Sequence, residues 1–143
     1  MDAIKFAKVG SEPSIKQQPL VLIVDDNEDN LVLLSFVVEP LNCQIITAEN
    51  GQTTLELAQS CQPSLILLDM MLPDLSGIEV VAHLRQNPLT KAIPVIAVTA
   101  MAREQDRDRF LLAGCNAYVS KPFSVDELEQ LLIYYLNQDL PLN

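Results

Sequence analysis

Three carboxylates stand at the ends of apolar runs in this chain. Asp25 and Asp26 directly follow the run Leu20–Val24, and Asp69 directly follows the run Ser64–Leu68. Three carboxylates brought together repel one another, and at least one would hold a proton unless a cation were present. Mg²⁺ typically binds one or two carboxylates together with waters and phosphate oxygens, so it would relieve this repulsion. A carboxylate is also a nucleophile towards an activated phosphoryl group, which makes formation of an aspartyl phosphate the chemistry to consider.

A hydroxyl and an ammonium group complete the set of candidate residues. Thr99 follows the apolar run Pro94–Val98, and Lys121 stands shortly after the run Ala117–Val119. Phosphoryl transfer depends mainly on positioning and on neutralisation of charge. Mg²⁺ and the Lys121 ammonium would supply the neutralisation, and the Thr99 hydroxyl would bond a phosphoryl oxygen.

The apolar runs themselves predict buried parallel strands. Continuous Val, Ile and Leu residues over this length are typical of strands covered on both faces. A fifth run, Gln44–Ala48, predicts an edge strand. Amphipathic stretches between the runs predict helices near residues 31–38, 52–60, 77–86, 102–113 and 124–135. Pro40 should end the first helix near residue 38 or 39, and Ser124 with Glu127 predicts a capping box at the last.

Five strand-then-helix units in order predict an α/β fold, a doubly wound five-stranded parallel sheet with helices on both faces. Ligands of such sheets bind beyond the carboxyl ends of the strands, where the candidate side chains should therefore converge. We predict a flexible N-terminal tail over residues 1–19, one folded domain over residues 20–138, and a C-terminal tail over residues 139–143.

Composition limits the classes of function. The chain has 143 residues, of which 49% are hydrophobic, and a net charge of −10, which argues against direct binding of nucleic acid. No apolar run approaches the roughly 18 residues that would predict a membrane span. Three widely spaced cysteines form no metal-binding pair, so we expect buried structural thiols and a cytoplasmic location.

The motifs around the candidate residues carry a resemblance to a known family. They are Asp25-Asp26, Asp69 within Asp-Met-Met-Leu-Pro-Asp-Leu-Ser-Gly, Val98-Thr99-Ala100, and Tyr118-Val-Ser-Lys-Pro-Phe. In this order and spacing they resemble the response-regulator receiver family of two-component signalling, over about residues 20–137. The resemblance implies a flavodoxin-like receiver fold with five helices and the strand order 2-1-3-4-5.

The resemblance also implies the chemistry of each position. Asp69 would accept phosphate from a phosphohistidine of a histidine kinase or a histidine phosphotransfer protein. Asp26 and Asp69 would ligate Mg²⁺ directly, Asp25 mostly through water, and the backbone carbonyl of Met71 would be a further ligand. Lys121 would pair with Asp69 and then with its phosphoryl group.

Signalling in the family implies a switch and a protein target. Thr99 would move towards the phosphate and Tyr118 would follow it inward, and the Lys121–Pro122 bond would be cis, which costs little before proline. The phosphorylated form would bind a downstream protein or relay its phosphate. Such a domain is not an enzyme in the ordinary sense, because it catalyses only its own phosphorylation and dephosphorylation.

Two other functions are open to test. A protein-binding module that does not depend on phosphorylation would have the same fold. A phosphatase of the haloacid-dehalogenase type would also use an aspartyl nucleophile, but it expects a second Asp where this chain has Met71.

The first and last helices have more apolar residues than one inward stripe needs. Val32, Leu33, Phe36 and Val37 are left over on the first helix, and Ile133, Tyr134 and Leu136 on the last. Packing of the two helices against each other would absorb part of this surplus. The remainder predicts a docking surface for a partner helix or a homodimer contact.

Overall fold

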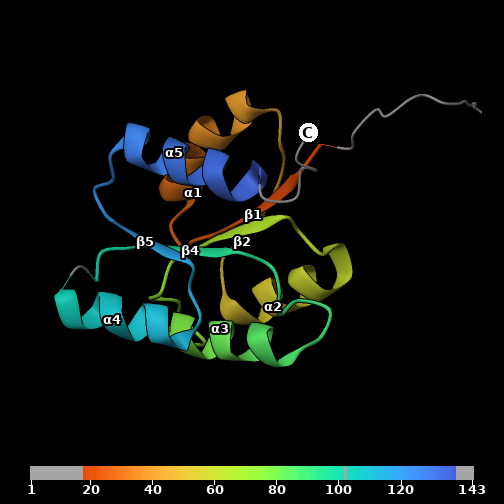
Figure 1. Cartoon of the computed structure of the whole chain (residues 1–143), viewed down its shortest axis with the longest axis vertical. Coiled ribbons are helices and arrows are strands. Elements are labelled where there is room, and N and C mark those ends of the chain that lie inside the picture. The colour runs from red at the N-terminus through yellow and green to blue at the C-terminus, as the bar shows by residue number, and fades with distance from the viewer. Residues whose placement is uncertain (1–17, 102, 138–143) are drawn as a thin grey trace, which may run out of the picture.

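The computed structural model describes residues 18–101 and 103–137, so most of the two predicted tails lies outside the described residues. Within that part of the chain, five strands and five α-helices alternate (Figure 1). The strands are β1 (Leu20–Val24), β2 (Gln44–Ala48), β3 (Leu65–Leu68), β4 (Val95–Thr99) and β5 (Ala117–Ser120). The helices are α1 (Glu28–Val38), α2 (Gly51–Cys61), α3 (Gly77–Gln86), α4 (Glu104–Ala113) and α5 (Val125–Leu136).

The strands form one parallel sheet in the order β2-β1-β3-β4-β5, which confirms the predicted fold class and strand order. Val24, the last residue of β1, pairs with Ala48 on one side and with Leu68 on the other. Thr99 at the end of β4 likewise pairs with Ser120 at the end of β5. Because the strand ends are aligned in this way, the residues that follow them meet at one edge of the sheet.

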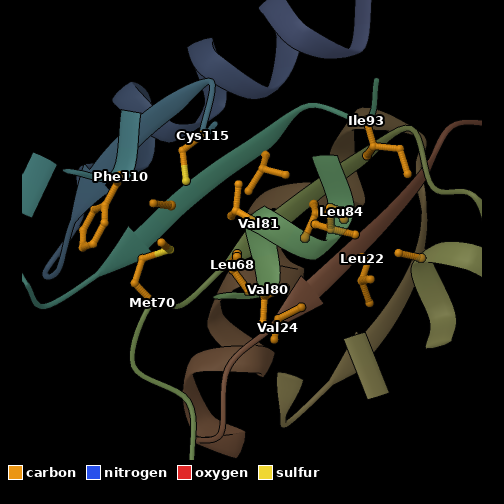
Figure 2. Close-up of a cluster of buried hydrophobic side chains, with 14 of the residues drawn as sticks. Leu22, Val24, Leu68, Met70, Val80, Val81, Leu84, Ile93, Phe110 and Cys115 are labelled. Carbon is orange, nitrogen blue, oxygen red and sulfur yellow. The ribbon is translucent and has the colours of Figure 1, made fainter. Parts of the chain in front are cut away.

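Helices cover both faces of the sheet. In Figure 1, α1 and α5 lie on one side, and α2, α3 and α4 lie on the other. Successive strand residues point to opposite faces, so Leu22 and Val24 belong to the cluster beneath α2, α3 and α4, whereas Val21 and Ile23 pack beneath α1 and α5. Figure 2 shows the first of these clusters, which extends to Phe110 of α4. The unbroken apolar runs of the sequence therefore reflect two buried faces.

Packing absorbs part of the apolar surplus on α1. Val37, which was left over from the inward stripe, is 6% exposed and packs into the cluster beneath α1 and α5. Val32, Leu33 and Phe36 are 52%, 48% and 66% exposed, and we call these three residues the α1 patch. On α5, Leu136 packs partly against the core, whereas Ile133 and Tyr134 are exposed.

Side-chain caps define the starts of most helices. Asn27, Asn50 and Ser124 each accept a hydrogen bond from a backbone N–H of the first turn. Ser76 and Glu79 of α3 form a full reciprocal capping box. At α5, where the sequence predicted a capping box, the structure gives only the hydrogen bond from the Glu127 N–H to the Ser124 hydroxyl. The fourth helix begins at residue 104, later than the predicted 102, and residues 39–41 form a 3₁₀ turn around the expected break.

An arginine holds the opposite edge of the sheet, where the strands begin. The Arg85 guanidinium at the end of α3 donates hydrogen bonds to the carbonyl oxygens of Lys91, Ile93 and Gly114 and to Asn116 Oδ1. Burial lowers the pKa of this group, and all these acceptors are neutral oxygens. The arginine therefore ties the loops that lead into β4 and β5 to α3.

The cysteines are free, but they are not all buried as predicted. Cys115 is buried, Cys43 is partly buried, and Cys61 is exposed at the end of α2. Among residues 18–101 and 103–137, no helix combines the length and apolar character that crossing a bilayer requires.

Candidate functional site

The three aspartates lie together at the carboxyl edge of the sheet. One carboxylate oxygen from each of Asp25, Asp26 and Asp69 lies within 4.8 Å of the other two. The sheet fixes their backbones, because the Asp25 N–H donates to the Ala48 carbonyl at 3.1 Å and the Asp69 N–H donates to the Val24 carbonyl at 3.0 Å. These bonds continue the strand ladders one residue past the strands, so Asp25 and Asp69 are placed by regular structure, and Asp26 is the residue after Asp25.

Lys121 reaches this cluster from the end of β5 and contacts two of its members. Its Nζ donates to Asp25 Oδ2 at 2.5 Å and to Asp69 Oδ2 at 3.0 Å. Asp69 was the predicted partner of the lysine, whereas the contact with Asp25 was not predicted. The Lys121–Pro122 peptide is cis, as the resemblance implied.

The lysine stays charged despite its surroundings. Burial lowers the pKa of Lys121, but hydrogen bonds and charges from Asp25 and Asp69 outweigh that effect and raise the pKa above its ordinary value. Asp25 is 1% and Asp69 7% exposed, so both bonds are shielded from water, whereas Asp26 is exposed. Lys121 is therefore a fixed positive charge at neutral pH.

The donor atoms of the cluster fit a hard divalent cation. Three carboxylates against one ammonium leave two negative charges in excess within a few ångströms. Carboxylate and carbonyl oxygens are the ligands that Mg²⁺ prefers. The Met71 N–H donates to Asp69 Oδ1 at 3.0 Å, which keeps the Met71 backbone beside the cluster, while its side chain is 56% exposed.

Thr99 and Tyr118, the predicted switch residues, are joined through the backbone of Met101. The Thr99 hydroxyl is fully buried at the end of β4 and accepts a hydrogen bond from the Met101 N–H at 3.4 Å. The Tyr118 hydroxyl donates to the Met101 carbonyl at 3.0 Å, and its ring lies 6.0 Å from that of Phe110 on α4. Tyr118 thus contacts the loop after β4 and the fourth helix.

Asp74 is a further acidic residue near the cluster, and it was not among the predicted site residues. It lies in the loop between β3 and α3, and its carboxylate accepts hydrogen bonds from the backbone N–H groups of Gly51 and Gln52. These bonds lower the pKa of Asp74. No local pattern could have revealed them, because donor and acceptor are 22 or 23 residues apart.

An apolar hollow lies next to Lys121, between α1 and the loop that leads into α5. Its volume is about 390 Å³, and its lining is mostly apolar. The lining residues are Asn30, Leu33, Leu34, Lys121, Pro122, Phe123 and Val125. Leu33 belongs to the α1 patch, so this hollow joins the patch to the candidate site.

Comparison with known sequences gives matches over nearly all of the described chain. The family model described as the response regulator receiver domain matches residues 21–133. The polar-differentiation response regulator DivK of Brucella anthropi is 42% identical over 116 residues, which are 81% of this chain and 94% of that protein. The protein of the same name in Brucella ovis is 41% identical over the same shares.

Solved structures resemble the chain over a similar extent. A putative response regulator from Chloroflexus aurantiacus has a TM-score of 0.81 at 28% identity, covering 85% of this chain and 100% of that one. The receiver domain of the sensor histidine kinase PA1611 from Pseudomonas aeruginosa has a TM-score of 0.78 at 29% identity over the same shares. That structure has a magnesium ion coordinated in its active-site cleft.

Proposed function

The chain belongs to the response regulator receiver family of two-component signalling, and we propose that Asp69 is its phosphoacceptor. The observation that carries the proposal is the position of Asp69 between Lys121, 3.0 Å from its Oδ2, and the two other carboxylates. Asp69 follows β3, the central strand of the sheet; β1 beside it brings Asp25 and Asp26, and Lys121 reaches it from the end of β5. We take residues 20–138 as the receiver unit.

The proposed reaction is transfer from a phosphohistidine. A carboxylate oxygen of Asp69 attacks phosphorus, an O–P bond forms, and the P–N bond breaks with its electron pair left on the imidazole nitrogen. Charge is then spread over the phosphoryl oxygens, and the Lys121 ammonium neutralises part of it. The shielded bonds of Lys121 support this role, because a fixed charge needs no rearrangement when the phosphoryl group arrives.

We propose Mg²⁺ as the cofactor. Asp26 and Asp69 would hold it directly, Asp25 mostly through water, and the Met71 carbonyl would be a further ligand. Bound Mg²⁺ would neutralise the carboxylates and polarise the transferred group. The excess of two negative charges in the cluster supports this assignment.

Thr99 and Tyr118 are the proposed switch. The Thr99 hydroxyl would bond a phosphoryl oxygen on Asp69, which would take it away from the Met101 N–H. Tyr118 bonds the carbonyl of the same methionine, so a change at Thr99 would reach the tyrosine through one residue. This link supports a response at the surface near α4.

The phosphodonor is proposed to be a histidine kinase or a histidine phosphotransfer protein, and the output a downstream protein. The hollow beside Lys121 and the α1 patch support docking of a partner helix here, because they put an apolar surface next to the phosphoacceptor. A homodimer contact on the same patch is the alternative. Cytoplasmic location remains a prediction from the cysteines.

The test of the phosphoacceptor is labelling with phosphoramidate or acetyl phosphate. We expect incorporation that requires Mg²⁺, that disappears in Asp69→Asn, and that persists in the exposed control Asp126→Asn. Labelling of Asp69→Asn at the wild-type level would contradict the proposal. Repeated turnover of a phosphomonoester would instead favour a phosphatase.

Two further measurements separate the partner hypotheses. Phe36→Glu combined with Tyr134→Glu should slow transfer from a phosphohistidine donor and leave labelling by phosphoramidate unchanged. If neither transfer nor sedimentation changes, the α1 patch has no docking role. Equal affinity of wild type and Asp69→Asn for a target, with and without phosphodonor, would favour the module that does not depend on phosphorylation.

A further inference from the structure

The Asp74 carboxylate joins the loop after Asp69 to the first turn of α2. We propose that Asp74 is a positioning residue for the metal site, because it holds this loop, and with it the Met71 backbone, beside the acidic cluster. The inference rests on the proposed function, since it takes Met71 as a metal ligand.

Both carboxylate oxygens of Asp74 are engaged. Oδ1 accepts from the Gly51 N–H at 2.7 Å and from the Leu75 N–H at 2.9 Å, and Oδ2 accepts from the Gln52 N–H at 2.9 Å. The first N–H groups of a helix have no partner within the helix, and a carboxylate there also interacts favourably with the helix dipole. Asp74 therefore serves as a cap that is supplied from a different segment of the chain.

The two ends of the loop that carries Asp74 are bonded to each other. Met71 and Ser76 form an antiparallel bridge, and the Gly77 N–H donates to the Met70 carbonyl at 2.9 Å. A Cβ at Gly77 would lie 2.5 Å from Met70 Cα, so the two ends of the loop are in close contact. A shift of the loop at Asp74 would therefore be passed to Met71.

The start of α2 is itself fixed relative to the opposite side of the site. The Asp25 N–H donates to the carbonyl of Ala48, the last residue of β2, and only two residues separate Ala48 from the start of α2. Asp74 then connects α2 to the loop that carries Met71. The backbones on the two sides of the acidic cluster are thus held to one helix end, in addition to their direct link through Lys121.

Gly51 offers a second way to disturb the same contact without changing a charge. A Cβ at Gly51 would lie 2.8 Å from Leu75 Cβ, closer than such atoms approach. Gly51→Ala should therefore push the loop, with Asp74, away from α2 without removing any carboxylate from the protein.

The experiment is a titration with Mg²⁺ by calorimetry, together with thermal unfolding without the ion. We expect Asp74→Ala to weaken Mg²⁺ binding roughly tenfold, the scale at which residues behind metal ligands act. Gly51→Ala should also weaken binding, and Asp74→Asn should weaken it less, because an amide keeps one acceptor. The matched control is Asn50→Ala, which removes a cap from the same helix end and should bind Mg²⁺ as the wild type does.

The outcomes separate this inference from the proposed function. Unchanged Mg²⁺ affinity in Asp74→Ala, with wild type binding the ion and Asp69→Asn binding it poorly, overturns the positioning role alone. Equal losses in Asp74→Ala and Asn50→Ala also overturn it, because helix stability would then explain the effect. If the wild type binds no Mg²⁺, the proposed function and this inference both fail. Should Asp74→Ala not fold, Asp74→Asn and Gly51→Ala decide in the same way.

Discussion

At the amino ends of the strands, the Arg85 guanidinium lies among neutral carbonyl oxygens, whereas at the carboxyl ends three carboxylates face one ammonium group. The N–H groups of Arg85 donate to oxygens that the fold holds in place, so this edge needs no bound ligand to pair its charge. The carboxyl end has an excess of negative charge that the protein leaves uncompensated. The same sheet thus has a self-sufficient edge, where the strands begin, and an edge that the proposed Mg²⁺ would complete.

The largest effect on stability should come from the self-sufficient edge. Arg85→Met leaves several buried or half-buried acceptors without their donor, and we expect a loss of about 3 kcal/mol in the free energy of unfolding. Denaturant unfolding would measure it. The exposed Arg107→Met is the control and should change stability little. If Arg85→Met lowers the free energy of unfolding no more than Arg107→Met does, water replaces the guanidinium without cost.

Cys115, beside Arg85, should make the same edge sensitive to alkali. Burial raises the pKa of its thiol to about 11 from 9.0, and the nearby Arg85 charge offsets part of this shift. The folded state keeps the proton that the unfolded state loses, so this stabilisation is complete below pH 9 and is lost as pH rises to 11. The loss is about 2 to 3 kcal/mol for one thiol.

Comparing two cysteines tests that assignment. The alkaline loss of stability should become smaller in Cys115→Ala and remain in Cys61→Ala, because Cys61 is exposed. Unfolding measured between pH 8 and 11.5 would show this, with the pH range set by the pKa difference. Identical pH profiles for the two variants would exclude Cys115 as the source.

These contrasts show what the sequence could and could not predict. The apolar runs predict the strands, and the side chains that follow parallel strands meet at one edge of the sheet. Asp25, Asp69 and Lys121 could therefore be placed at one edge in advance. Val37 could not be placed, because its burial depends on how α1 packs against α5 and the sheet. The bonds of Asp74 to α2 depend on two loops meeting in space, for which no local spacing gives a signal.

Mg²⁺ should stabilise the carboxyl edge without involving the amino edge. At ten times its dissociation constant, a ligand of the folded state adds about 1.4 kcal/mol to the free energy of unfolding. We expect this increment in wild type and, undiminished, in Arg85→Met, because the two edges share no partner. Asp69→Asn should show a smaller increment with Mg²⁺. Thermal unfolding with and without Mg²⁺ measures all three, and a reduced increment in Arg85→Met would mean that the edges are coupled.

The smallest expected effect is an increase in stability, caused by removing a charge from the carboxyl edge. Asp26 is exposed and repels two neighbouring carboxylates, so Asp26→Asn should raise stability without Mg²⁺ by up to about 1 kcal/mol, a value limited by solvent screening. Asp25→Asn should lower stability instead, because Asp25 is buried and bonded to Lys121. With Mg²⁺ present, both variants should fall below wild type, since each loses affinity for the ion. Destabilisation by Asp26→Asn in the absence of Mg²⁺ would show that this edge tolerates its excess charge, and the distinction between the two edges would then fail.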